Sequence, residues 1–271
     1  EISCSLVGSE MCIRDRFSDA SNKLGTQMKA TGEVMSIGRT MEESLLKAMR
    51  SLETGVCHIY HKKFDDWTND RLLEYIAEPT DDRLYAIAQL IRGGVDLVLI
   101  YNRTKIDMFF LEKFKNIVEF ERVVEAAPMD IEVLREAKRM GFSDKFIGQL
   151  WGVSQHDMYL LREKNGIFPV YKMIDTCASE FASYVPYFYS TYEEENESVV
   201  SPKEKIIVLG SGPIRIGQGV EFDYSTVHAI WSIRAAGYEA IIINNNPETV
   251  STDYTTSDKL YFEPLTVEDV M

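Results

Sequence analysis

Long apolar runs are missing from the sequence, and so are clusters of basic residues. The longest apolar stretches, such as "LVLI" and "AIII", are far shorter than the roughly 18 residues that a membrane-spanning helix needs. The formal net charge is -14, from 29 basic and 43 acidic residues, so the chain repels nucleic acid phosphate. We therefore expect no membrane and no nucleic acid as a partner.

Cysteine is also scarce. The chain has no Cys-x-x-Cys spacing and no paired His signature among its four cysteines, which are Cys4, Cys12, Cys57 and Cys177. Such a set indicates neither a zinc site nor a disulfide framework. A reducing, cytoplasmic location fits it best.

What is present is typical of a globular protein, with 45% hydrophobic and 27% charged residues. The length of 271 residues exceeds the typical domain of about 100–200 residues, which favours two or more domains.

Residues 1–16, "EISCSLVGSEMCIRDR", have no basic region or small-residue cleavage site, unlike a signal peptide. They resemble a translated sequencing-adapter artefact, so we expect them to be non-native; an ordinary disordered terminus is the alternative.

Helical patterns dominate the middle of the chain. A stretch punctuated by Gly and Thr, "NKLGTQMKATGEVMSIGRT", predicts strands and turns. Thr40 with Glu43 predicts a capping box at the start of a helix, and helical periods then run from about residue 51 to 197. Ser143 and Ser154 mark further helix starts.

The segment "FSDKFIGQLWGVSQHDMYLLREKNG" has the form of two short helices around a Gly152 turn, as in a DNA-binding helix-turn-helix. Its second helix offers only Arg162 and Lys164 as basic residues. A plain helical hairpin is therefore the better interpretation.

After the acidic run at residues 192–205, which predicts a solvated connection, the pattern changes to α/β. The strand "KIIVLG", the helix "EFDYSTVHAIWSIRAAG" and the strand "YEAIIINN" follow in turn, and "KLYFEP" follows later. This order predicts a βαβ unit. Thr266 and Asp269 predict one more helix start just before the sequence ends, so we expect the α/β unit to be truncated.

The stretch "GSGPIRIGQGVEFDY" starts like a dinucleotide-binding loop. A nicotinamide site, however, needs Gly-x-Gly-x-x-Gly and an acidic residue at the end of the second strand. The glycines have another spacing, the second strand ends in three asparagines, and no Gly-Lys-Ser/Thr follows, so a phosphate loop is excluded too. From the residues alone, the loop with Arg215 and Glu221 is either an anion-handling edge or a structural turn.

Longer segments carry a more specific resemblance. "GPIRIGQGVEFDYSTVHA" and "NNNPETVSTDYTTSDKLYFEP" resemble the start of the second synthetase half of the carbamoyl phosphate synthase large chain family. "TQMKATGEVMSIGRT" is similar to the end of the first half, and "YKMIDTCASEFASYVPYFYSTYEEE" to the segment that leaves the helical oligomerisation domain. The resemblance covers about residues 17–271.

The resemblance implies a mixed fold, with a mainly α-helical middle domain followed by a truncated Rossmann-like α/β unit of the pre-ATP-grasp type. It assigns residues 17–52 to the tail of the first ATP-grasp half, 53–199 to the oligomerisation domain, and 200–271 to the start of the second half. The parent would be a ligase that makes carbamoyl phosphate from bicarbonate, glutamine-derived ammonia and two ATP, using Mg or Mn. Its partners would be a glutaminase subunit and, through the helical domain, further copies of itself.

The family's catalytic, nucleotide and metal residues have no counterpart in this sequence, so we expect the fragment alone to be inactive and to bind no cofactor. The positions that match the family line its carbamate tunnel: Glu33, Arg215, Gly219, Glu221 and Glu248. A buried structural role is the alternative for each carboxylate. Two other classes stay open at this point, a dinucleotide-dependent oxidoreductase and a non-catalytic helical interaction module.

Overall fold

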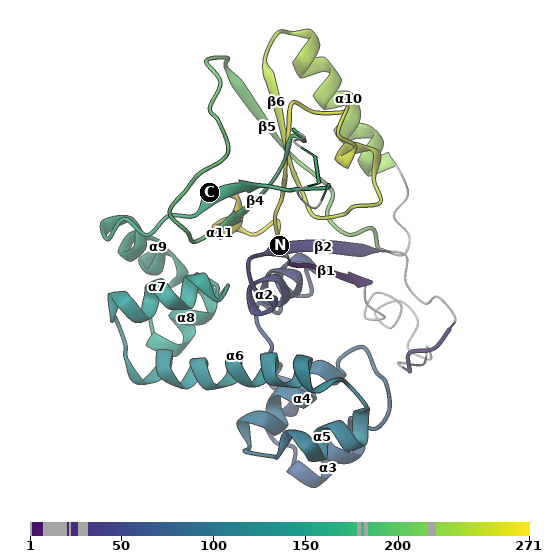
Figure 1. Ribbon diagram of the computed structural model, residues 1–271, viewed down its shortest axis with the longest axis vertical. Helices are drawn as coiled ribbons and strands as arrows, with labels where there is room; N and C mark the ends of the chain where they lie inside the picture. The colour runs from purple at the N-terminus through teal and green to yellow at the C-terminus, as the bar shows by residue number, and fades with distance from the viewer. Residues whose placement is uncertain are drawn as a thin grey trace.

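The computed structural model describes residues 2–7, 21, 23–26, 32–177, 180–181, 184–215 and 221–271. These residues form a helical part and a sheet part, and one strand–helix segment lies between them (Figure 1). That segment is strand β2 (Glu33–Gly38) followed by helix α2 (Met41–Ser51). In the described part of the chain, no helix is both long enough and apolar enough to cross a membrane.

The helical part confirms the prediction for most of the middle of the chain. Its helices are η1 (Lys62–Phe64), α3 (Asn69–Tyr75), α4 (Arg83–Arg92), α5 (Leu97–Thr104), α6 (Met108–Ala126), α7 (Ile131–Arg139), α8 (Asp144–Trp151) and α9 (Gln155–Lys164). Leu46 and Met49 of α2 are fully buried in the same core as Ile87, Val118 and Phe142. Helix α2 therefore packs against the helical part and shares its core.

Helix starts agree with the capping signals in the sequence. The Ser154 side chain accepts a hydrogen bond from the Asp157 backbone, and the Asp157 side chain accepts one from the Ser154 backbone, which completes a capping box at α9. The Thr40 hydroxyl caps α2 by accepting from the Glu43 backbone N–H at 3.2 Å. The Glu43 carboxylate, however, accepts from the Arg39 backbone N–H at 2.7 Å, so only half of the predicted box forms at α2.

A five-stranded sheet makes up the second part, in the order β3-β4-β7-β6-β5. Its strands are β3 (Val170–Met173), β4 (Tyr187–Thr191), β5 (Lys205–Leu209), β6 (Glu239–Asn244) and β7 (Lys259–Phe262). Strands β4, β7, β6 and β5 run parallel, and β3 pairs antiparallel with β4. Helix α10 (Glu221–Ala235) connects β5 to β6, as the sequence predicts for a βαβ unit.

Residues 170–191 correct the helical interpretation of residues 53–199. They contribute β3 and β4, which extend the sheet of the α/β unit instead of continuing the helices. Their aromatic residues favour a pleated, buried surface. Phe188 and Tyr189 are buried at 1% and 0% exposure, and Tyr189 joins a core with Ile230 and Ile242.

The start of the chain takes part in the fold. Strand β1 (Ile2–Val7) pairs antiparallel with β2, with Ile2 opposite Gly38. Residues 2–7 are thus paired in this structure, while the non-native origin expected for residues 1–16 stays a prediction. The assignment of residues 17–52 to an ATP-grasp tail also stays a prediction, because the structure shows only that β2 and α2 pack between the two parts.

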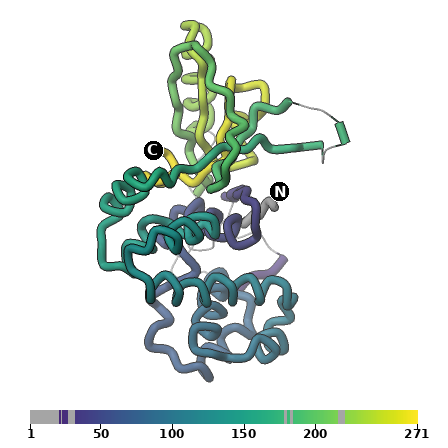
Figure 2. Tube along the Cα trace, turned by 60° about the vertical axis from the view of Figure 1, so that its left-hand side comes forward, coloured from purple at the N-terminus to yellow at the C-terminus, as the bar shows by residue number. Residues whose placement is uncertain are grey.

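The last residues of the chain pack against the helical part. After β7, helix α11 (Val267–Val270) lies beside α7, α8 and α9, as Figures 1 and 2 both show. The Thr266 hydroxyl accepts from the Asp269 backbone N–H at 3.3 Å, which confirms the last predicted helix start. The sheet part and the helical part are therefore joined at α11 as well as through the chain connection.

Candidate functional site

The candidate site lies where loops at the carboxyl ends of the parallel strands meet β2 and the end of α2. Ligands of open α/β sheets bind at this edge. The loop after β5 supplies residues 211–215, and the end of β6 with the loop that follows it supplies residues 244–248. The Met35 backbone N–H of β2 donates to the Asn245 carbonyl at 2.8 Å, which fixes β2 against this edge.

Glu33 and Glu248, two of the five predicted site residues, come together here. Glu33 is the first residue of β2 and is partly exposed, and Glu248 follows β6. Partial burial raises the pKa of the Glu33 carboxyl, and the neighbouring Glu248 carboxylate raises it further by repulsion and hydrogen bonding. The pair is therefore a place where a carboxyl can keep its proton more readily than in water.

Arg215 is held by a residue that sequence reasoning missed. Its guanidinium Nη2 donates to the Glu53 carboxylate Oε2 at 2.8 Å and lies 3.3 Å from the Glu53 carbonyl. Burial raises the pKa of Glu53, while Arg215 opposes that effect. Glu53 follows the C-cap of α2 in a left-handed conformation, with φ of 54°. No sequence motif marks it, because its role depends on a partner far along the chain.

The glycine-rich loop is packed against asparagine side chains. Asn244, Asn245 and Asn246 are all buried, and the Asn244 side-chain oxygen accepts from the Gly212 backbone N–H at 3.1 Å. A Cβ on Gly210 would lie 2.3 Å from Asn244 Cγ, and one on Gly212 would lie 2.5 Å from Glu53 Oε1. These contacts support the structural-turn interpretation for the first part of the loop.

The two remaining predicted residues are Glu221 and Gly219. Glu221 is exposed and begins α10, where its negative charge is favourable at a helix N-terminus. Gly219 lies outside the described residues. Across the described ranges, no group of three or more His, Cys, Asp or Glu residues could hold a metal ion.

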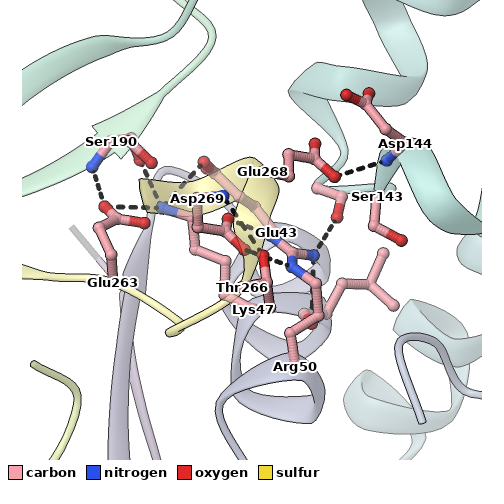
Figure 3. Close-up of polar contacts among 12 residues, drawn as sticks. Glu43, Lys47, Arg50, Ser143, Asp144, Ser190, Glu263, Thr266, Glu268 and Asp269 are labelled. Carbon is pink, nitrogen blue, oxygen red and sulfur yellow. Dashed lines mark hydrogen bonds and ion pairs between the residues drawn. The ribbon is translucent and has the colours of Figure 1, made fainter. Parts of the chain in front are cut away.

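A cluster of buried charges lies beside this edge, between α2, β4 and the end of the chain (Figure 3). The Arg50 guanidinium donates to both carboxylate oxygens of Asp269, at 3.2 and 3.1 Å. Lys47 donates to the carbonyls of Ile37 and Ser190, and its Nζ lies 3.6 Å from Glu263 Oε1. Burial works to raise the pKa of Asp269, but Arg50, together with Thr266 and Lys47, outweighs burial and the pKa is lowered.

The same cluster extends into the helical part. Glu268 accepts from the Lys138 ammonium and, at 2.7 Å, from the Asp144 backbone N–H at the start of α8. Asp144 also binds Arg162, whose Nη2 lies 2.7 Å from Asp144 Oδ2. Burial raises the pKa of Glu268 although Lys138 opposes it. We call these eight residues the junction cluster: Lys47, Arg50, Lys138, Asp144, Arg162, Glu263, Glu268 and Asp269.

Two family models match the chain. Residues 33–166 match the model described as carbamoyl-phosphate synthetase large chain, oligomerisation domain. Residues 202–271 match the carbamoyl phosphate synthase preATP-grasp domain. The first match starts at Glu33 and includes β2 and α2, and the second covers β5 to α11. The Glu33–Glu248 pair thus joins one matched domain to the other.

Proposed function

Since the chain belongs to the carbamoyl phosphate synthase large chain family, we propose that it supplies the junction between the two synthetase halves of a carbamoyl phosphate synthase. The parent protein joins bicarbonate-derived carbon and glutamine-derived ammonia at the expense of ATP. In this proposal, part of the carbamate passage runs along the edge where Glu33 and Glu248 meet.

The Glu33–Glu248 pair is the observation that carries the proposal. The two carboxyls come from different matched domains, and Glu33 has a raised pKa beside Glu248. Carbamate is a short-lived species that must be kept from bulk water, and polar walls can hydrogen-bond it without trapping it. In this proposal, the carboxyls of Glu33 and Glu248 supply polar groups to such a wall.

ATP and its magnesium or manganese ion belong to the parent enzyme, and we assign no residue of this chain to them. The glutaminase subunit supplies ammonia to the parent. The helical part, which matches an oligomerisation domain, is proposed to bind further copies of the same protein. The polypeptide alone is expected to turn over no ATP.

The test uses the full-length large chain paired with its glutaminase subunit. Gly219→Phe places a bulky side chain where the family has its passage. We expect bicarbonate-dependent ATP hydrolysis and ATP synthesis from carbamoyl phosphate to persist, while overall carbamoyl phosphate formation falls by at least about ten-fold, roughly 1.4 kcal/mol of lost coupling. Glu221→Ala and Glu248→Ala are expected to keep both partial reactions and to lower overall carbamoyl phosphate formation less than Gly219→Phe does. These two substitutions change the wall of the passage without blocking the passage.

Glu195→Ala is the matched control, since the Glu195 side chain is 88% exposed. It is expected to leave all three activities unchanged. An equal fall of all three activities in Gly219→Phe would assign the loop to folding and remove the support for a passage.

A further inference from the structure

The junction cluster takes no part in the proposed passage, yet it buries many charges in one place. The side chains of Lys138 and Asp144 are 2% and 1% exposed, and those of Glu268 and Asp269 are 6% and 7% exposed. Buried ion pairs contribute little net stability relative to apolar packing, but breaking one leaves an uncompensated charge. Such a cluster is therefore better suited to fixing one relative position of its elements than to stabilising the fold.

The elements it fixes are those that carry the carboxyl pair. Glu33 begins β2, which leads directly into α2, and Arg50 lies in the last turn of α2. Glu248 lies between β6 and β7, and Asp269 follows β7 in α11. The Arg50–Asp269 pair thus ties the β2–α2 segment to the strands whose loop holds Glu248.

Polar contacts run along the whole β2–α2 segment. Lys47 bridges the end of β2 and the carbonyl of Ser190 in β4. Beyond Arg50, the Asn245 side-chain amide donates to the Ser51 carbonyl at 3.3 Å. Lys138 of α7 extends the tie to the rest of the helical part through Glu268. A shift of α2 or α11 would therefore change how closely Glu33 approaches Glu248.

We infer that Arg50 and Lys138, with their partners Asp269 and Glu268, are positioning residues that hold Glu33 against Glu248 across the boundary between the two matched domains. They touch neither carboxyl and act through β2 and the loop after β6. The inference rests on the proposed function only where it assigns the Glu33–Glu248 pair to a carbamate passage. The positioning of the two carboxyls can be measured without any enzymatic reaction.

The experiment follows the titration of the Glu33 carboxyl by NMR in the 271-residue chain with carbon-13-labelled glutamate. The Glu33→Gln chain identifies the signal, and the Glu248→Gln chain gives the titration midpoint of Glu33 without its neighbour. We expect Asp269→Asn and Glu268→Gln each to move the Glu33 midpoint down toward the Glu248→Gln value. Arg50→Lys, which keeps the cation, is expected to hold the midpoint near that of the unaltered chain.

Glu119→Gln is the matched control, because Glu119 forms an exposed pair with Lys115 within one helix. The Glu33 midpoint in this variant should equal that in the unaltered chain. An unchanged Glu33 midpoint in folded Asp269→Asn and Glu268→Gln chains would overturn the inference. Loss of circular dichroism in both variants would also overturn it, because the cluster would then hold the fold as a whole. The Glu33 midpoint can move in these two variants while carbamate transit in the parent does not depend on Glu248. That result would support the positioning role of the cluster and contradict the proposed passage at Glu248.

Discussion

His58 lies in the core of the helical part and is 1% exposed. Its ring stacks on Phe146 with centroids 3.7 Å apart, and its Nε2 is 2.9 Å from Glu121 Oε1. Arg92 binds the same carboxylate. Burial lowers the pKa of His58 below its ordinary value of 6.5, although Glu121 acts in the opposite direction and Arg92 and Arg50 act with burial. The folded chain therefore keeps this histidine neutral where the unfolded chain protonates it.

The sign of the resulting pH dependence follows from proton binding. The unfolded state has the higher pKa, so stability from His58 is present above pH 6.5 and is lost as the pH falls below that value. We expect a loss of up to about 1.4 kcal/mol per pH unit from this group. Urea unfolding at pH 7.5 and 5.5 measures it, and His58→Gln is expected to lose less stability between those pH values than the unaltered chain. His156→Gln, at an exposed histidine, is the control; equal pH slopes in all three chains would contradict the prediction.

Between elements, the turn from α7 to α8 packs closely against α2. Gly141 has φ of 89°, and a Cβ there would lie 2.8 Å from the Glu43 Cα. Its carbonyl accepts from Arg50 Nη1 at 2.8 Å. Gly152, at the end of α8, has φ of 70° but open space around a Cβ. The two glycines share a left-handed backbone and differ in what surrounds them.

Gly141→Ala is therefore expected to destabilise the chain more than Gly152→Ala. Both substitutions strain a left-handed backbone, which costs about 1–2 kcal/mol. Only the first forces α7 and α8 away from the α2 backbone, which adds about 1–3 kcal/mol of overpacking. Urea unfolding of the two variants gives the difference in the free energy of unfolding, and equal losses would show that the α2 contact can relax freely.

The elements also show which features the sequence could predict. The cap at Ser154 and the order of β5, α10, β6 and β7 depend on neighbouring residues, and both are confirmed. Strands β3 and β4 were missed because β4 gains its place by pairing with β7, some 70 residues further along. The Glu33–Glu248 and Glu53–Arg215 contacts are just as long-range. Local signals carry no information about such pairs, and only the family resemblance pointed to Glu33 and Glu248 as members of one site.

For the whole molecule, the net charge of -14 opposes association of copies over most of the surface. The span from Asp96 to Lys113 is an exception, because its three acidic and three basic residues cancel. Large apolar side chains are exposed within it, at 38–55% of their surface: Val98, Leu99, Tyr101, Phe109 and Phe110. Exposed apolar residues in a neutral setting are typical of a surface that binds another protein.

The whole chain is accordingly expected to self-associate through α5 and α6, as the match to an oligomerisation domain suggests. Sedimentation velocity at about tens of micromolar measures it, since association depends on protomer concentration. Leu99→Glu combined with Phe110→Glu places like charges on both copies, and we expect the dissociation constant to rise at least about ten-fold, equivalent to 1.4 kcal/mol. Leu160→Glu alters an apolar residue of α9 that is 45% exposed and should leave association unchanged.

If the unaltered chain sediments only as a monomer, the proposed self-association fails. If it associates and the double variant does so equally well, another surface joins the copies, because α5 and α6 would then carry repelling charges without effect.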